Sequence, residues 1–323
     1  MMWWRAIVAL LAIGNAVGDQ QVVPLVAVND MFLAGMSIGT PAQSVLVELD
    51  TGSTHSWVPA VGVPSYNPTL SSSYAATGVP FDVHYADGTG SFGVTGDDVA
   101  TLGDMANTTS ARVRLGIVDR TSVRASDADG RMYGVMGLSP ASPAAMTFLA
   151  ATNGTMITFD VSKGVVMITG DATDRDMVWV PTIPSPTPSW EILTDSIQFG
   201  GTVHRAAHAL IDTGCTWIRI PSRQARPIFR LLNADDNGFI SNCQSRDSWP
   251  VLNVVVQGKI VAIGWRHWTM IEDNQQGCVV KFRAHDSHMW TLGVPFLSAA
   301  RVTFRYLPAG NATVGITFHS VQS

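Results

Sequence analysis

Two copies of the tripeptide Asp-Thr-Gly stand about half a chain apart in this sequence of 323 residues. The first begins at Asp50 and the second at Asp212. Both copies follow an apolar stretch, and both are followed by a proline at the same distance, Pro59 and Pro221. A single Asp-Thr-Gly would indicate no more than a capped turn, so it is the pair that indicates a function.

Two such aspartates can do chemistry if their loops meet in space. If two related halves pack about a pseudo-twofold axis, Asp50 and Asp212 come together, and carboxyl groups at close range share one proton. The ionised member can take a proton from a bound water, and the protonated member can donate to a carbonyl oxygen. Thr51 and Thr213 can hydrogen-bond across the axis, and the glycine after each lets the backbone approach the carboxyl groups. The pattern predicts amide hydrolysis without a covalent intermediate.

The rest of the sequence fits two related lobes built of short strands. Residues 135–137 and 291–293 form a second pair of matching segments, each apolar and ending in glycine. A proline-rich stretch, 181–189, cannot form a regular helix or a central strand and is predicted to be the crossover between lobes. Residues 81–93 predict a hairpin with a two-residue Asp-Gly turn, and residues 222–232 predict a helix with one apolar face.

The composition excludes several classes of protein. Hydrophobic residues make up 46% of the chain and charged residues 14%, against about 25% charged in typical proteins, which excludes a disordered chain. The net charge of −5, without a run of Lys or Arg, argues against a nucleic-acid binder. No group of His, Cys, Asp and Glu has the spacing of metal ligands along the chain, so we expect neither a metal nor a cofactor.

The segment 1–18 resembles a secretory signal peptide. Arg5 precedes an apolar run, 6–13, and residues 16–18 offer a cleavage site of small residues; a hydrophobic first strand or an uncleaved anchor is the alternative. No other stretch approaches the ~18 apolar residues needed to span a bilayer. After cleavage we expect no membrane span, and either secretion or an endo-lysosomal or vacuolar location. Three candidate glycosylation sites agree with this route: Asn107, Asn153 and Asn311.

This constellation resembles the pepsin-like aspartic proteases, in their cathepsin D-like branch, over nearly the whole chain after the leader. The resemblance implies an all-β, bilobal pepsin-like acid protease fold: two related β lobes about a pseudo-twofold axis, with a few short helices. It also implies a monomer with polypeptide substrates that is inhibited by pepstatin-type compounds. The implied segments are a signal peptide (1–18), an N-terminal lobe (19–180), the crossover (181–189) and a C-terminal lobe (190–323).

The resemblance assigns roles residue by residue. The catalytic pair is Asp50 and Asp212. The residues supporting it are Thr51, Gly52, Ser53, Thr213, Gly214 and Cys215. The substrate-binding candidates are Tyr85, Asp87, Gly88, Glu48, Trp57 and Leu210. Tyr85 matches the tyrosine of the flap that closes over substrate, although it could be an ordinary cross-strand aromatic residue, and Trp57 fits flap support and core equally. Cys243 and Cys278 match the second-lobe disulfide, which is expected to stabilise the fold by roughly 3–4 kcal/mol.

Two residues near the motifs depart from the pattern of the family. Cys215 stands where the family has Ser or Thr, and a thiol donates a weaker hydrogen bond than a hydroxyl, so we expect a weaker contact to Asp212. A thiol nucleophile is the less favoured alternative. Glu48 lies on the same strand face as Asp50, where the family has an apolar residue lining the S1 pocket. It either selects a basic or hydrogen-bonding P1 residue, adds another proton to the site, or turns to solvent at the rim.

The leading hypothesis is an aspartic endopeptidase that cuts polypeptides in mildly acidic conditions. Only the short segment 19–49 lies between the leader and Asp50, and no part of it forms a Lys-rich inhibitory segment, so we expect either no conventional pro-segment or a very short one. The alternative is a secreted homologue of the same fold that binds peptides or proteins with little or no catalysis. Cys215, Glu48 and a short stretch between residues 137 and 164 favour this alternative. A sugar-binding β-sandwich would explain the composition but not the repeat.

Overall fold

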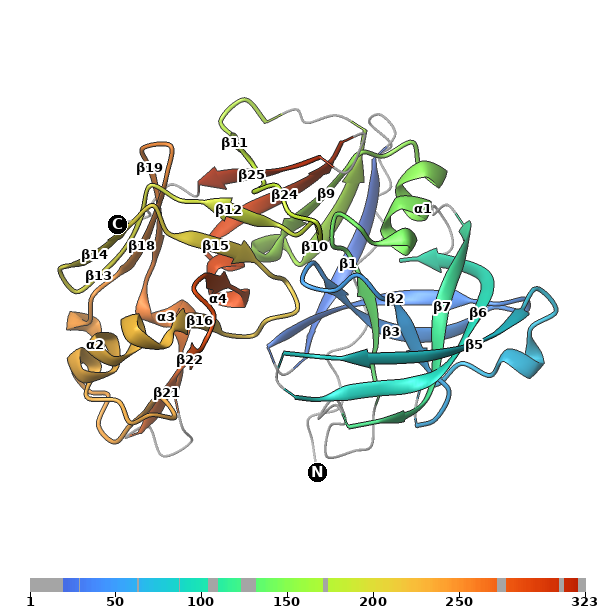
Figure 1. Cartoon of the computed structure of the whole chain (residues 1–323), viewed down its shortest axis with the longest axis horizontal. Helices are drawn as coiled ribbons and strands as arrows, with labels where there is room; N and C mark the ends of the chain where they lie inside the picture. Colours follow the sequence, from blue (N-terminus) through green and yellow to red (C-terminus); the bar gives the residue numbers. More distant parts are fainter. Residues whose placement is uncertain are drawn as a thin grey trace.

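The structure is a computed structural model that describes residues 20–28, 30–62, 64–86, 88–103, 110–122, 132–170, 174–271, 277–307 and 311–318. The predicted signal peptide and the sequon at Asn107 lie outside the described residues. Strands from the two halves of the chain occupy the two sides of Figure 1, with β9, β10, β24 and β25 between them. The strands belong to four sheets.

The largest sheet takes strands from both halves of the chain and has the order β11-β25-β24-β9-β10-β1-β2-β3-β8-β4-β7-β6-β5. The two C-terminal strands, β24 and β25, pair with each other and with β9 and β11. The last two strands of the chain therefore belong to the same sheet as its first strand, β1. The bounds are β1 Gln21–Val28, β2 Met31–Ile38, β3 Gln43–Asp50, β4 Trp57–Pro59, β5 Ala75–His84, β6 Gly90–Leu102, β7 Ser110–Thr121, β8 Gly134–Gly137, β9 Met156–Asp160, β10 Val165–Thr169, β11 Val178–Pro181, β24 Ala300–Tyr306 and β25 Ala312–Phe318.

Three smaller sheets make up most of the second half of the chain, on the left of Figure 1. The first, in the order β12-β15-β23-β16-β22, consists of β12 Glu191–Leu193, β15 His208–Ile211, β23 Trp290–Leu292, β16 Ile218–Pro221 and β22 Phe282–His285. The second consists of β14 Thr202–Arg205, β13 Ser196–Phe199, β18 Leu252–Val256 and β19 Lys259–Ile263. The third consists of β17 Phe239–Ile240, β21 Cys278–Val280 and β20 Thr269–Ile271.

Helices are few and short in the part of the chain that the structure describes. They are α1 Pro143–Ala151, α2 Ser222–Leu232, α3 Trp265–Trp268 and α4 Val294–Leu297, with single 3-10 turns at Pro68–Leu70, Val161–Lys163 and Arg246–Ser248. The predicted helix 222–232 is confirmed as α2, whose buried residues Ala225, Ile228, Phe229 and Leu232 lie on one face. No helix among the described residues has the length and apolar character to cross a bilayer.

The strands around the two Asp-Thr-Gly motifs are arranged alike in both halves. In the first half, β8 lies between β3 and β4, parallel to β3 and antiparallel to β4, and β7 runs parallel to β4. In the second half, β23 lies between β15 and β16 with the same directions, and β22 runs parallel to β16. The matching segments 135–137 and 291–293 thus occupy equivalent places. The predicted all-β fold of two related lobes is confirmed.

The two halves also share a contact directly behind the first motif. The backbone N of Leu138, just after β8, donates to the carbonyl oxygen of Asp50 at 2.7 Å. The carbonyl oxygen of Leu138 accepts two bonds from the second half, from Trp190 Nε1 at 2.8 Å and Tyr306 Oη at 2.6 Å. Trp190 is fully buried, with its ring 5.0 Å from that of Tyr306. This buried network fixes the backbone on which Asp50 depends.

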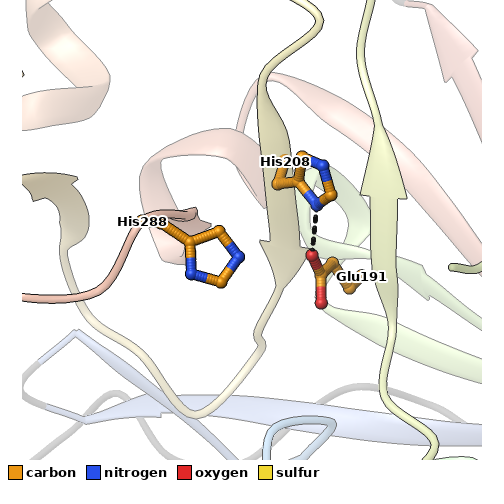
Figure 2. Close-up of side chains that lie close together, drawn as sticks. All are labelled: Glu191, His208 and His288. Carbon is orange, nitrogen blue, oxygen red and sulfur yellow. Dashed lines mark hydrogen bonds and ion pairs between the residues drawn. The ribbon is translucent and has the colours of Figure 1, made fainter. Parts of the chain in front are cut away.

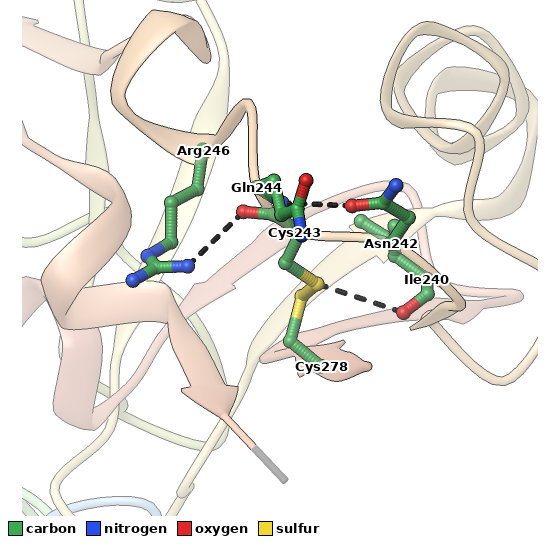
Figure 3. Close-up of a disulfide and its surroundings, with 6 residues drawn as sticks. All are labelled: Ile240, Asn242, Cys243, Gln244, Arg246 and Cys278. Atoms are coloured by element: carbon green, nitrogen blue, oxygen red, sulfur yellow. Dashed lines mark hydrogen bonds between the residues drawn. A yellow bond between two sulfur atoms is a disulfide. The ribbon is translucent and has the colours of Figure 1, made fainter. Parts of the chain in front are cut away.

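A disulfide joins Cys243 and Cys278 in the second half, as the resemblance implied (Figure 3). It links the first residue of β21 to the loop after β17, and both cysteines are fully buried. The Arg246 Nη1 group donates to the Cys243 carbonyl at 3.2 Å and helps to hold this loop. The remaining cysteine, Cys215, is a free thiol.

Candidate active site

Each motif aspartate stands at the end of a strand and is tied to the strand beside it. Asp50 is the last residue of β3 and is opposite Gly137 in the parallel ladder with β8. Asp212 follows β15, and its backbone N donates to the Leu292 carbonyl of β23 at 3.2 Å. The equivalent topology of the two sheets therefore brings both loops to equivalent places.

The threonines of the two motifs bind the loops to each other. The backbone N of Thr51 donates to Thr213 Oγ1 at 2.9 Å, and the backbone N of Thr213 donates to Thr51 Oγ1 at 2.9 Å. Each hydroxyl then donates to the opposite strand, Thr51 Oγ1 to the Ile211 carbonyl at 3.0 Å and Thr213 Oγ1 to the Leu49 carbonyl. Both threonines are buried. This reciprocal arrangement fixes one loop against the other.

The glycines of the two motifs allow the closest approach between the halves. A Cβ atom added to Gly52 would lie 2.6 Å from Asp212 Oδ2, and one added to Gly214 would lie 2.4 Å from Asp50 Cγ. Each loop therefore packs its backbone directly on the carboxyl group of the other loop. The two carboxyl groups lie together at the contact between the halves, as the paired motifs predicted.

The two carboxyl groups differ in their hydrogen-bond donors. Asp50 accepts from the backbone N of Gly52 at 2.8 Å and from the hydroxyl of Ser53. Asp212 accepts from the backbone N of Gly214 at 3.0 Å. Burial raises the pKa of Asp212 well above its usual range, and the charge of Asp50 and a hydrogen bond with it raise the pKa further. This environment favours the protonated form of Asp212.

Cys215, the counterpart of Ser53, was expected to make a weak contact to Asp212, but its thiol donates to a backbone carbonyl instead. Its Sγ donates to the Trp217 carbonyl at 3.2 Å. Burial, and then the charge of Asp212, raise the pKa of this thiol to about 12. The thiol therefore stays protonated at physiological pH, which argues against a thiolate nucleophile.

Comparison with known proteins agrees with this geometry. The family model described as Eukaryotic aspartyl protease matches residues 31–317. The chain belongs to the eukaryotic aspartyl protease family. It is 27% identical over 327 residues to pepsin A of Canis lupus familiaris, covering 88% of this chain and 80% of that protein.

Two further relatives illustrate the range of the family. The chain is 27% identical over 329 residues to the probable vacuolar protease A of Arthroderma benhamiae (strain ATCC MYA-4681 / CBS 112371), covering 89% of this chain and 78% of that protein. It is 25% identical over 313 residues to pregnancy-associated glycoprotein 2 of Bos taurus, covering 88% and 81%. As a member of this family, the chain is related to peptidases that act on polypeptides.

Glu48 stands beside the aspartate pair and departs from what the resemblance implied for this position. On β3 it is opposite Leu33 of β2 and Val135 of β8, which are both buried apolar residues. Burial raises the pKa of Glu48 well above its usual range, and the charges of Asp50 and Asp212 raise it further. This environment argues against a freely solvated carboxylate at the rim and favours a third protonated carboxyl group next to the pair.

The raised pKa of Glu48 predicts a pH-dependent effect on stability. A carboxyl group whose pKa is higher in the folded protein contributes stability below its unfolded pKa, about 4.3 for Glu. That contribution is lost as pH rises through the folded pKa. Glu48→Gln should therefore raise the free energy of unfolding at pH 7 but not at pH 3.5, by about 1.4 kcal/mol for each pH unit by which folding raises the pKa. Urea unfolding at both pH values measures this difference, with the exposed Asp236→Asn as the control. An equal effect of Glu48→Gln at both values would contradict the prediction.

The predicted hairpin 81–93 is confirmed as β5 and β6, although its turn is longer than two residues. Tyr85 N donates to the Thr89 carbonyl at 2.8 Å, and Gly88 N donates to the Tyr85 carbonyl at 3.0 Å, so the turn spans 86–88. Gly88 has the positive φ of 85° that glycine tolerates, and Asp87 lies outside the described residues. The register that pairs Tyr85 with Thr89 leaves three residues in the turn, one more than the Asp-Gly signal predicted.

Trp57 and Tyr85 are brought together by β4 and this hairpin. Trp57 Nε1 donates to Tyr85 Oη at 2.6 Å, and Trp57 is buried whereas Tyr85 is half-buried. Trp57 also packs against Phe81, Val118 and Val135. Trp57 thus belongs to a core cluster and at the same time holds the tyrosine side chain.

Leu210 is the counterpart of Glu48 in the second half. It is half-buried on β15, two residues before Asp212, opposite Thr291 of β23 and Glu191 of β12.

A separate cavity of about 500 Å³ lies between β6, β7 and α1, with Thr54–Ser56 among its lining residues. That lining contains none of the predicted site residues.

Two features of the site were missed by the sequence analysis. Arg219 on β16 opposes the rise of the pKa of Asp212 through its positive charge. It stands seven residues after Asp212, as Trp57 does after Asp50, so the aligned repeat could have identified it. Glu191, His208 and His288 also lie together, close enough to bind a metal ion. They come from three separate segments, and no spacing in the sequence indicates their grouping.

Proposed function

We propose that this protein is an aspartic endopeptidase in which a water between Asp50 and Asp212 attacks a peptide carbonyl. The observation that carries the proposal is the mutual packing of Gly52 on Asp212 and of Gly214 on Asp50. Asp50, with two donors, takes the proton of the water, and the protonated Asp212 donates to the carbonyl oxygen. Polypeptide substrates are those expected of the family.

Cys215→Ser tests the asymmetry between the two carboxyl groups. A hydroxyl placed as in Ser53 would donate to Asp212 and favour its charged form, which lowers the pKa of Asp212. Asp212 would then lose its catalytic proton at a lower pH. We expect the upper limb of the pH profile of kcat/KM to move down by about 0.7 unit, the equivalent of a hydrogen bond of about 1 kcal/mol. If the pH profile of Cys215→Ser matched that of the wild type, Cys215 would have no influence on the pKa of Asp212.

We propose that Glu48 makes the protein prefer substrates whose P1 side chain can form a hydrogen bond with it. Because its pKa is raised, Glu48 is protonated at the acidic working pH and can donate to or accept from a polar P1 side chain. We expect Glu48→Gln to keep the wild-type P1 preference and Glu48→Val to shift it towards apolar residues. Profiling with a peptide library measures both variants. The idea fails if Glu48→Val leaves the preference unchanged.

Tyr85 is proposed to close over the bound peptide, supported by its bond to Trp57. Gly88 would present the backbone of the turn to the substrate, and Leu210 would line the opposite side. Extended substrate chains commonly bind by adding strand-like hydrogen bonds.

We further propose that the protein is a monomer and follows the secretory route, either to secretion or to an endo-lysosomal or vacuolar compartment. The exposed side chains of Asn153 and Asn311 would then be open to glycosylation.

The proposal is tested by cleavage of a quenched-fluorescent peptide pool between pH 3 and 7, with and without pepstatin. The protein must be folded, with the disulfide between Cys243 and Cys278 intact. We expect cleavage in acid that pepstatin abolishes. Absence of cleavage by the folded protein at every pH would contradict the proposal and leave a peptide-binding homologue as the function.

A further inference from the structure

A group of three metal-binding side chains lies outside the aspartate pair, in the sheet that contains β15. Each of Glu191, His208 and His288 offers one ligand atom, and these atoms all lie within 4.8 Å of one another. Figure 2 shows the ring of His288 turned towards the other two side chains, with His208 Nδ1 bonded to Glu191 Oε1 at 2.6 Å. The rings of His208 and His288 are 5.7 Å apart between centroids.

The first two members are held on neighbouring strands. β12 and β15 are antiparallel, with Glu191 opposite Leu210 and Leu193 opposite His208. Glu191 and His208 are therefore diagonal neighbours on one face of the sheet. The Glu191 side chain is 16% exposed and the His208 side chain 41% exposed, so both are anchored but remain open to a small ion.

The third member stands on a short loop that is fixed at both ends. His288 is exposed, in the loop between β22 and β23. His285 Nε2 lies 2.9 Å from the Met289 carbonyl, and Ser222 Oγ donates to the His285 carbonyl at 2.9 Å. At the far end, Trp290 Nε1 donates to Gln224 Oε1 at 2.7 Å. The loop thus presents His288 to the strand pair.

Two imidazoles and one carboxylate form a donor set suited to zinc and related divalent transition metals. Donors on a tetrahedral Zn²⁺ with bonds of about 2.0–2.1 Å are roughly 3.3 Å apart. Glu191 and His208 would separate slightly, and His288 would move inward by at most about 1.5 Å, which side-chain rotation on an exposed loop allows. A carboxylate–histidine hydrogen bond joins Glu191 and His208, and an edge-to-face ring contact with His208 places His288 beside them, so all three donors face one small volume.

We propose that Glu191, His208 and His288 bind a divalent transition-metal ion such as Zn²⁺, with water completing the coordination. The ion joins the loop after β22 to the β12–β15 pair and stabilises this sheet by binding the folded chain. The ion would lie on the face of β15 that carries His208 and Leu210, and Asp212 follows two residues after Leu210. His208 precedes Asp212 by four residues, so at about 3.3 Å per residue their backbone positions are roughly 13 Å apart along the strand.

The test is titration of the metal-free, disulfide-intact protein with ZnCl₂ at pH 7.5 by calorimetry. We expect one ion per wild-type chain and a rise in the melting temperature that EDTA reverses. His288→Ala, which removes an exposed side chain, should weaken binding by at least about tenfold. Glu191→Gln should weaken it as well.

His84→Ala is the matched control. His84 pairs with Asp82 at 3.0 Å, with both side chains more than half exposed, but belongs to no group of three ligands among the described residues. His84→Ala should bind zinc like the wild type. Absence of saturable binding to the wild type would overturn the proposal. So would equal affinities of His288→Ala and the wild type, because the ion would then be bound elsewhere.

Discussion

Asp212→Asn is expected to lower kcat/KM by about 10²–10⁴-fold while leaving the fold intact. An amide of the same shape cannot supply the acidic proton that the carbonyl oxygen of the substrate requires, and positioned acid–base groups contribute about 10²–10⁴-fold. The folded pKa of Asp212 is raised by burial and by Asp50. The stability it contributes is therefore present below its unfolded pKa, about 3.9, and lost as pH rises. The neutral Asn should accordingly raise the free energy of unfolding at pH 7.

Opposite effects on activity and stability separate a catalytic residue from a structural one. Peptide cleavage at acidic pH and urea unfolding at pH 7 measure the two effects of Asp212→Asn. The exposed Asp119→Asn is the control and should change neither quantity. If Asp212→Asn kept most of its activity, or lost it only together with stability, the proposed role of Asp212 would be wrong.

Gly214→Ala is expected to reduce activity by about 10²-fold or more, because its new methyl group would overlap the carboxyl group of Asp50. The added Cβ would lie 2.4 Å from both Cγ and Oδ1 of Asp50. Either the carboxyl group or the loop must then move, and a displacement of about 1 Å at a reacting group can cost about 10²-fold. Overpacking of this kind also costs about 1–3 kcal/mol of stability. Gly52→Ala should act in the same way through Asp212.

The matched control for Gly214→Ala is Gly264→Ala. An added Cβ at Gly264 meets nothing within 4 Å, and its φ of −75° suits alanine. Peptide cleavage and thermal unfolding of both variants give the comparison. Equal activity of Gly214→Ala and Gly264→Ala would mean that the two loops do not pack as closely as the structure has them.

The repeated motif allowed much of the fold and the centre of the site to be predicted from the sequence. Two Asp-Thr-Gly motifs about half a chain apart require related strands, and the structure has β3 and β15 in equivalent ladders. The second pair of matching segments forms most of β8 and β23, which pair with the motif strands β3 and β15. Alternation along β3 also put Glu48 on the face of Asp50, but the burial that contributes most to its raised pKa became visible only in the structure, where Leu33 and Val135 lie opposite it.

Other features depend on side-chain direction and on strand register, which the sequence does not specify. The bond from the Cys215 thiol to the Trp217 carbonyl depends on a rotamer, and motif matching could not distinguish it from a bond to Asp212. Glu191 and His208 meet because of the antiparallel register of β12 and β15. His288 joins them through a loop whose path is set by its contacts with α2.

We propose that Asp50 and Asp212 act as one catalytic unit, which a double-mutant cycle can test. kcat/KM would be measured at the acidic optimum for the wild type, Asp50→Asn, Asp212→Asn and the double variant. Residues that act as a unit are strongly non-additive. We expect each single variant to lose about 10²–10⁴-fold and the double variant to lose little more. Losses that multiply, or a single variant that retains most of the activity, would contradict the proposal.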